Sequence, residues 1–168
     1  MVAENHKPVL IVIAGPNGSG KTTITSKILR HEWMEDAVYV NPDQVAQDKF
    51  GDWNSKEAVM QAVQYCEDRR EDCLRRGKSL IFETVLSSDG KVDFIRRAKE
   101  AGFFIRIFFV ATNHPSINAS RIAQRVMEGG HLPQGRRKYD IILLKNAGRG
   151  AEAEDVGAAS RTCVYDVT

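Results

Sequence analysis

A glycine-rich loop near the N-terminus constrains the fold of this chain more than any other feature. Residues 15–22 read GPNGSGKT, which fits the pattern G-x-x-x-x-G-K-[ST]. An apolar, β-branched run over residues 9–14 leads into the loop, and a stretch typical of a helix, residues 22–29, leads out of it. A strand, this loop and a helix in that order make the phosphate-binding loop (P-loop, or Walker A motif) of an α/β protein.

Each part of the loop has a physical reason to bind phosphate. Glycines let the backbone fold close around phosphate oxygens, and the loop N–H groups and the helix N-terminus both point at negative charge. Lys21 would add a cation near the β- and γ-phosphates, and the Thr22 hydroxyl would bind Mg²⁺. We therefore expect bound ATP or GTP, the alternative being a glycine-rich turn without a ligand. The residues expected to contact the nucleotide are Gly15, Pro16, Asn17, Gly18, Ser19, Gly20, Lys21, Thr22 and Thr23.

Length and composition indicate a single domain over residues 1–168 with a core of its own. A net charge of +2 and an aromatic content of 8% argue against a long nucleic-acid partner. No apolar run reaches membrane-spanning length and the N-terminus does not resemble a secretory signal, so we expect a cytoplasmic protein. The three cysteines show no C-x-x-C spacing, which favours reduced thiols packed as small apolar residues.

Strand and helix patterns alternate along the chain. The expected elements are strand 9–14, helix 21–31, strand 37–40, helix 56–76, strand 79–83, helix 92–101, strand 103–111, helix 117–128, helix 139–146 and strand 162–167, with a loop or weak helix over 147–160. Gly77 should end the longest helix, because glycine adopts the left-handed conformation found there. This alternation predicts a parallel sheet with helices on both faces.

The absence of two motifs argues against two classes of P-loop protein, the GTPases and the transport ATPases. The chain has no N-K-x-D segment, which a GTPase uses to read guanine, and residues 127–131, MEGGH, do not match the L-S-G-G-Q segment of transport ATPases. The remaining layout is that of a small kinase, in which an acid orients or deprotonates the acceptor hydroxyl and cations neutralise the transferring phosphoryl group. We therefore expect an α/β fold, a P-loop kinase-like three-layer sandwich with a central parallel sheet and a small lid.

Two carboxylates follow expected strands and should lie at the carboxyl edge of the sheet, where ligands bind in such folds. Asp43, in Asn-Pro-Asp after the second strand, is the candidate base. Its side chain could also be a helix N-cap, and the two roles do not exclude each other. Glu83, in Phe-Glu-Thr at the end of the third, could act through Mg²⁺ or hold a substrate hydroxyl, or could be an ordinary strand-end residue. The adjacent Thr84 is a further candidate substrate contact.

Arginines late in the chain are candidate phosphate ligands, because a guanidinium pairs with phosphate oxygens. These residues are Arg121, Arg125, Arg136 and Arg137. The first two are four apart and share one helix face. Gly129 and Gly130 resemble a hinge, so the segment could close over bound phosphates as a lid. His131 could contact the substrate or stabilise a turn, and each arginine could instead be a solvated surface charge.

These motifs together resemble the zeta toxin family, in particular its short single-domain branch, some members of which are labelled predicted ABC-type ATPases. The combination of N-x-D, F-E-T and R-V-x-x-G-G-H is far more specific than the P-loop alone, and the matches extend over about residues 10–140. The matching segments are GPNGSGKTT (15–23), VNPDQVA (40–46), FETVLSS (82–88) and RVMEGGHLP (125–133), with Tyr165-Asp166 similar to the terminal strand.

The resemblance implies an enzyme that uses ATP and Mg²⁺ to phosphorylate the amino-sugar 3′-hydroxyl of UDP-N-acetylglucosamine. It also implies that the protein is the toxin of a toxin–antitoxin pair, blocked by an antitoxin protein. By position, Lys21 would be the P-loop lysine, Asp43 the base and Glu83 the substrate-binding acid. The phosphate-clamping arginines would be Arg125 and one of Arg136 and Arg137.

Two features depart from the family's pattern. Val85 stands where the family often has threonine, and the segment between His131 and Tyr139 is short. The sequence therefore supports a kinase more strongly than it supports a nucleotide sugar as the acceptor. Two alternatives stay open: a kinase of another small molecule or of a nucleic-acid end, and a nucleotide-switched binding protein that binds ATP without phosphorylating an acceptor.

Overall fold

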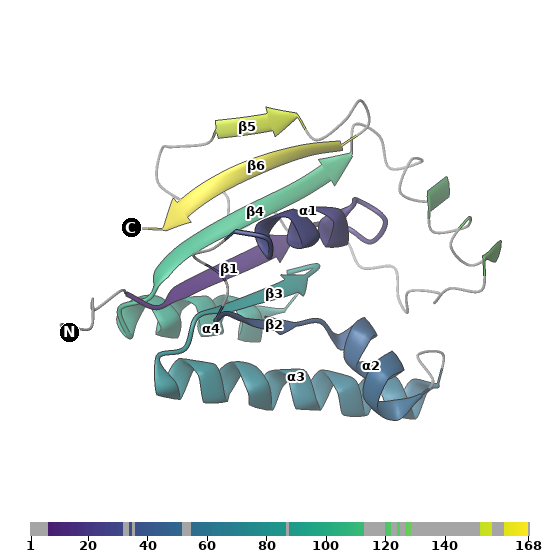
Figure 1. Cartoon of the computed structure of the whole chain (residues 1–168), viewed down its shortest axis with the longest axis horizontal. Helices are drawn as coiled ribbons and strands as arrows, with labels where there is room; N and C mark the ends of the chain where they lie inside the picture. Colours follow the sequence, from purple (N-terminus) through teal and green to yellow (C-terminus); the bar gives the residue numbers. More distant parts are fainter. Residues whose placement is uncertain are drawn as a thin grey trace.

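The computed structural model describes residues 7–31, 34, 36–51, 55–86, 88–112, 120–121, 124, 127–128, 152–155 and 160–167. They form a twisted sheet flanked by helices (Figure 1). The elements are β1 (Val9–Ala14), α1 (Lys21–Ile28), β2 (Val38–Val40), α2 (Pro42–Phe50), α3 (Lys56–Arg76), β3 (Leu80–Thr84), α4 (Asp89–Glu100), β4 (Phe104–Thr112), β5 (Glu152–Asp155) and β6 (Ser160–Val167).

The sheet has the strand order β2-β3-β1-β4-β6-β5. The first four strands in this order are parallel to one another, as the alternating pattern predicts. The strand expected over residues 162–167 is confirmed as β6, which runs antiparallel to β4. Because the carboxyl ends of β2, β3 and β1 lie at one edge, the turns that follow them meet there.

The prediction of a loop or weak helix over residues 147–160 is wrong at β5, which is a strand. The segment Glu152–Asp155 pairs antiparallel with β6 at the edge of the sheet. Its sequence, EAED, has low intrinsic strand propensity, so its backbone pairing with β6 overrides the local preference. An edge strand is also the place in a sheet where charged side chains are common.

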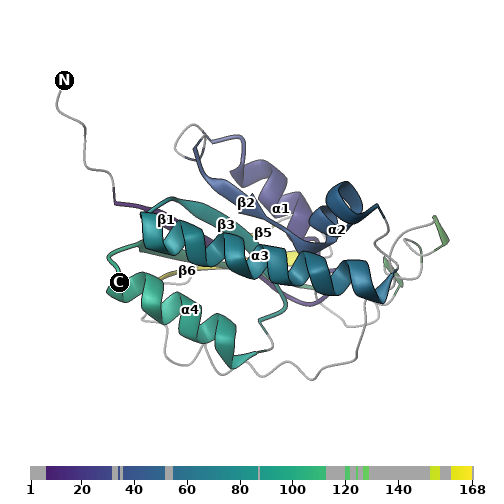
Figure 2. The ribbon, with the colours of Figure 1, turned by 90° about the horizontal axis from the view of Figure 1, so that it is seen from below.

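Alternate residues of β1 supply the cores on the two faces of the sheet. Leu10, Val12 and Ala14 lie in the cluster that α3 and α4 cover, and Ile11 and Ile13 lie in the one that α1 covers. All five side chains are fully buried, as a strand between two helical layers requires. Figure 2 shows α1 and α4 on opposite sides of the sheet, so the expected three-layer α/β architecture is confirmed.

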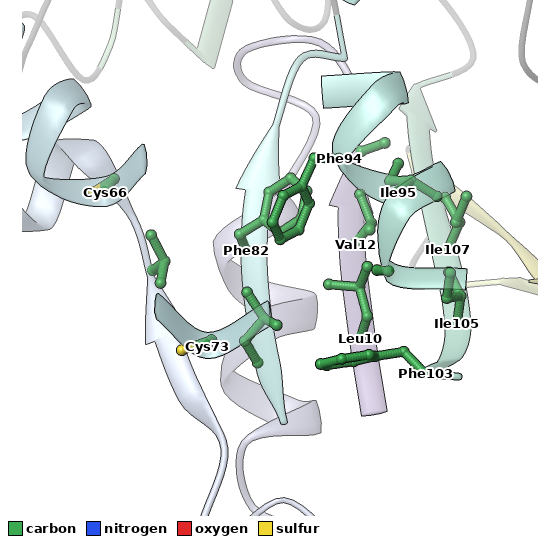
Figure 3. Packing of buried hydrophobic residues seen from close by; sticks show 14 residues of the cluster. Leu10, Val12, Cys66, Cys73, Phe82, Phe94, Ile95, Phe103, Ile105 and Ile107 are labelled. Atoms are coloured by element: carbon green, nitrogen blue, oxygen red, sulfur yellow. The ribbon is translucent and has the colours of Figure 1, made fainter. Parts of the chain in front are cut away.

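Helix α3 begins and ends where its sequence signals predict. The Ser55 side chain accepts a hydrogen bond from the Ala58 N–H, and Gly77 closes the helix in the left-handed conformation at φ 61°. Cys66 and Cys73 of this helix lie in the core cluster that also contains Phe82 (Figure 3). Both are free thiols, as expected, and burial raises the pKa of Cys66 to about 11.

Other expected elements differ from the structure by a few residues or fall beyond what it describes. Helix α1 is shorter than the expected 21–31, and α4 starts before the expected residue 92. Within the expected helix 117–128, the described residues 120, 121, 124 and 127 are helical, whereas the helix expected over 139–146 lies outside the described residues. No helix in the described part of the chain has the length and apolar character needed to cross a bilayer.

Candidate active site at the carboxyl edge of the sheet

The P-loop follows β1 and is wedged between the two neighbouring strands. The Gly15 N–H donates to the Thr84 carbonyl of β3 at 3.2 Å. On the other side, a Cβ at Gly15 would lie only 2.2 Å from the Val110 carbonyl oxygen of β4, and the residue has a φ of +153°. Only glycine fits such a close approach of two backbones. The first glycine of the motif therefore sets where the loop leaves the sheet.

The rest of the loop turns back toward α1, and the Lys21 side chain at the start of that helix lies over the loop. Gly18 and Gly20 have φ values of 78° and 100°, in the region that glycine adopts without strain. Lys21, half-buried at the start of α1, donates from Nζ to the carbonyl oxygens of Gly15 and Pro16, each at 3.0 Å. The ammonium group thus lies inside the curve of the loop, beside the N-terminus of α1, where phosphate oxygens bind in P-loops.

Glu83 meets α1 because of its position on β3. It pairs in register with Ile13 of β1, and it lies two residues after Ile81, so all three face the α1 side of the sheet. Its Oε1 accepts hydrogen bonds from Thr25 Oγ1 at 2.8 Å and from Tyr39 Oη at 2.7 Å. Its Oε2 accepts from Thr22 Oγ1 at 3.3 Å.

The contact between Thr22 and Glu83 fits a magnesium ion. In P-loop enzymes this ion is held by the loop hydroxyl and by an acid that follows a neighbouring strand. Mg²⁺ takes one or two carboxylates and completes its shell with water and substrate phosphates. The described residues contain no group of three or more His, Cys, Asp and Glu that could hold a metal by themselves. Of the roles left open for Glu83, the geometry favours the one through Mg²⁺.

Asp43 lies in the first turn of α2, directly after β2. The cap of this helix is Asn41, whose Oδ1 accepts from the N–H groups of Asp43 at 2.9 Å and Gln44 at 3.5 Å. The alternative of an Asp43 N-cap is therefore wrong. Pro42 explains the difference, because proline favours the first helical position and places the cap on the residue before it. The exposed Asp43 carboxylate is left for other chemistry.

Sequence reasoning did not identify Tyr39 and Asn41 as site residues. The Asn41 Nδ2 group donates to Tyr39 Oη at 2.8 Å, and the Tyr39 hydroxyl donates to Glu83. Burial, together with the nearby Glu83 charge, raises the pKa of Tyr39, so the phenol stays protonated. The alternation of side chains along β2 could have identified Tyr39. Val38 and Val40 face one side of the sheet, so Tyr39 faces the other side, where Glu83 lies.

Thr84 lies beside the P-loop backbone and is buried. Its carbonyl accepts from Gly15, and its Oγ1 accepts from the Leu86 N–H at 2.9 Å. Leu86 has a φ of 53°, which is uncommon for a residue other than glycine. The described contacts of Thr84 thus stabilise the turn after β3.

One of the late arginines reaches the P-loop. Arg121 donates from Nη1 to the Gly18 carbonyl at 3.3 Å. Arg121 therefore lies beside the phosphate-binding loop, as a phosphate ligand requires. The remaining candidates of this region lie outside the described residues. They are Arg125, Gly129, Gly130, His131, Arg136 and Arg137.

Solved structures similar to this chain share its fold. A candidate kinase from Chloroflexus aurantiacus has 19% sequence identity and a TM-score of 0.59, covering 77% of this chain and 72% of its own. A structure from the PezAT chromosomal toxin–antitoxin system of Streptococcus pneumoniae has 22% identity and a TM-score of 0.61, covering 74% of this chain. This chain spans only 55% of the pneumococcal one.

Comparisons of sequence identify the family. An uncharacterised protein of Haemophilus influenzae is 28% identical over 124 residues, which cover 73% of this chain and 84% of that protein. The zeta toxin family matches residues 2–154, nearly the whole chain. With the P-loop geometry and the kinase-like fold, this match shows that the chain belongs to the zeta toxin family and is a P-loop phosphotransferase of the kinase type.

Proposed function

We propose that this protein transfers the γ-phosphoryl group of ATP to a hydroxyl of a nucleotide sugar, with UDP-N-acetylglucosamine as the first candidate. One observation carries the proposal: the carboxyl edge of the sheet joins a P-loop, through Thr22, to Glu83, with the exposed Asp43 at the next turn. A nucleotide site and a carboxylate free to accept a proton are the parts that phosphoryl transfer needs.

Nucleotide binding exchanges contacts within the loop for contacts to phosphate. Lys21 would leave the carbonyls of Gly15 and Pro16 and turn its ammonium to the β- and γ-phosphates. Loop N–H groups and the N-terminus of α1 would bind the remaining oxygens. Thr22 and Glu83 would hold Mg²⁺, which supplies positive charge against the phosphates. The expected result is an ATP whose γ-phosphate faces the turn after β2.

Asp43 acts as the base in this proposal. The acceptor hydroxyl oxygen forms a bond to the γ-phosphorus while the bond from that phosphorus to the β–γ bridging oxygen breaks. The hydroxyl proton passes to the Asp43 carboxylate, and ADP leaves with the bridging oxygen. Asp43 suits this role because Asn41 already caps α2, so the carboxylate is not needed as the helix cap. Arg121, Arg125 and one of Arg136 and Arg137 would neutralise charge on the transferring group.

The biological context is a proposal of the same kind. Family membership and the similarity to a structure from a toxin–antitoxin system support a toxin that acts in the cytoplasm and is blocked by an antitoxin protein. The modified sugar hydroxyl would then be lost to the reactions that use this nucleotide sugar. Expression in a host cell tests this context, because growth should stop with the parent protein and continue with Asp43→Asn.

The acceptor is tested directly by incubation with labelled ATP and Mg²⁺. The panel contains UDP-sugars, free sugars, nucleosides and oligonucleotides, and mass spectrometry finds the product that gained a phosphate. We expect a UDP-sugar to gain it. Phosphate on a nucleoside or an oligonucleotide end would replace the nucleotide-sugar proposal with a different kinase. ATP binding with no phosphorylated acceptor would favour a nucleotide-switched binding protein.

A further inference from the structure

A line of hydrogen bonds joins the start of α2 to the P-loop. The Asp43 N–H donates to Asn41 Oδ1 at 2.9 Å, and Asn41 Nδ2 donates to Tyr39 Oη at 2.8 Å. The Tyr39 hydroxyl then donates to Glu83 Oε1 at 2.7 Å, and Glu83 Oε2 accepts from Thr22 at 3.3 Å. The base and the metal-binding pair of the proposed reaction thus share one connected framework.

We propose that Tyr39 is a positioning residue for phosphoryl transfer: its hydroxyl, oriented by Asn41, holds the Glu83 carboxylate in place to bind Mg²⁺ together with Thr22. The expected effect of Tyr39 on turnover rests on the proposed function. Its expected effect on Mg²⁺ binding does not depend on which acceptor is phosphorylated. Tyr39 does not touch the reacting atoms, and it acts only through Glu83.

The helix cap fixes the direction of the hydrogen bonds from Asn41 to Tyr39 and from Tyr39 to Glu83. Two backbone N–H groups point at the Asn41 oxygen, so that atom is the amide oxygen and the other is the NH₂ group. The NH₂ group can only donate, so the Tyr39 oxygen accepts from Asn41 and its single proton is free to point at Glu83.

The other donors to Glu83 cannot replace Tyr39. Thr25 has one hydroxyl proton and two acceptors within reach, the Lys21 carbonyl at 3.1 Å and Glu83 Oε1 at 2.8 Å. Thr22 makes the longest of the three contacts, and its hydroxyl is the expected metal ligand of the loop. Tyr39 makes the shortest of the three contacts, and its proton has no second acceptor among the described contacts. Removing its hydroxyl should therefore let the carboxylate rotate.

The test compares Tyr39→Phe with Tyr65→Phe, a matched control on α3. Phe at position 65 keeps the ring beneath the Lys49 ammonium, which lies 4.5 Å from the ring centre. A non-hydrolysable ATP analogue is titrated by calorimetry, first in EDTA and then at rising Mg²⁺. We expect Tyr39→Phe to bind the analogue normally in EDTA but to need about 10–100 times more Mg²⁺ for the metal-dependent gain in affinity. Tyr65→Phe should match the parent in both arms.

Asn41→Ser is the second variant and guards against a fold defect in the first. Serine keeps the N-cap but removes the NH₂ donor to Tyr39, so a smaller shift in the same direction is expected. On the identified acceptor, Tyr39→Phe should lower kcat and leave the KM of the acceptor near the parent value. Normal Mg²⁺ dependence in Tyr39→Phe, or no Mg²⁺ effect in the parent, would overturn the proposal. A shifted Mg²⁺ dependence without any phosphorylated acceptor would support it while contradicting the proposed kinase reaction.

Discussion

The candidate site has two corners that differ in the atoms that form them: the β1–α1 turn is the backbone corner, and the β2–α2 turn is the side-chain corner. At the β1–α1 turn the backbone forms the site: Gly15 passes beneath the Val110 carbonyl, and Lys21 lies against the loop's own carbonyl groups. At the β2–α2 turn side chains form it, since Asn41 caps the helix and joins Tyr39 to Glu83. The first corner has no room for a Cβ at Gly15, whereas the second depends on which polar atoms its side chains carry.

This difference predicts how substitutions divide between chemistry and stability. A change at Gly15 in the backbone corner alters the loop itself, so folding and nucleotide binding should change together. A change of a polar atom at the side-chain corner can leave the core untouched, since Asp43 is exposed and Tyr39 would keep its ring. Substitutions at the two corners therefore test whether stability and nucleotide binding change together at the backbone corner, and whether polar atoms can be changed without loss of stability at the side-chain corner.

The largest effect should come from Asp43→Asn at the side-chain corner. The substitution removes the proposed base while it keeps the shape of the side chain, and a general base contributes about 10²–10⁴ in rate. We expect phosphate transfer at least about a hundredfold slower, with ATP affinity near that of the parent. Single-turnover kinetics on the identified acceptor measure the rate, and calorimetry measures the affinity.

The control for this variant is Asp48→Asn, an exposed carboxylate on the same helix. It should keep full activity, which separates the base from a general loss of negative charge on α2. Because Asn41 provides the cap, Asp43→Asn should also unfold at nearly the same temperature as the parent. Unchanged turnover in Asp43→Asn would remove the base from this corner and make Glu83 the next candidate.

A large loss of stability is expected from Gly15→Ala at the backbone corner. The new methyl would lie 2.2 Å from the Val110 carbonyl oxygen, and the residue would keep a φ of +153°. Strain of this kind and overpacking together should lower the free energy of unfolding by about 2 kcal/mol or more. Chemical denaturation measures the loss, and ATP affinity should fall with it.

Gly90→Ala in α4 is the matched control. A Cβ there would have no heavy atom within 4 Å, and the residue is helical. Alanine at such a position should leave stability unchanged or raise it by up to about 1 kcal/mol. Equal stabilities for the two variants would mean that the loop can move away from β4, against the account of a wedged P-loop.

A smaller effect is expected from Lys21→Ala, also at the backbone corner. The substitution removes a charge-assisted contact to phosphate, which is typically worth about 1.5–3 kcal/mol. ATP affinity should therefore fall about tenfold or more. Lys27→Ala is the control, since Lys27 lies exposed in the last turn of the same helix. Equal affinity for Lys21→Ala and the parent would contradict phosphate binding by the loop.

The same contrast explains which parts of the molecule sequence reasoning could predict. The P-loop, α3 and the buried strands follow from local patterns: glycines, caps and apolar runs whose meaning depends on near neighbours in the chain. β5 could not be predicted, because the acidic segment Glu152–Asp155 forms a strand only through pairing with β6. Tyr39 was missed for a related reason, since its role depends on Glu83, which is distant in the sequence and adjacent in the sheet.

The smallest effect concerns the helix cap, which the sequence left open and the structure assigns to Asn41. Asn41→Ala should lower the free energy of unfolding by about 1 kcal/mol, because an N-cap is lost. Asn41→Ser should lose clearly less, since serine is also a good cap. Asp43→Ala removes only a carboxylate near the N-terminus of α2, an interaction worth about 0.3–1 kcal/mol. Urea denaturation of the three variants gives the ranking, and a greater loss in Asp43→Ala than in Asn41→Ala would return the cap to Asp43. That outcome would also weaken the case for Asp43 as the base, because its side chain would then be needed by the helix.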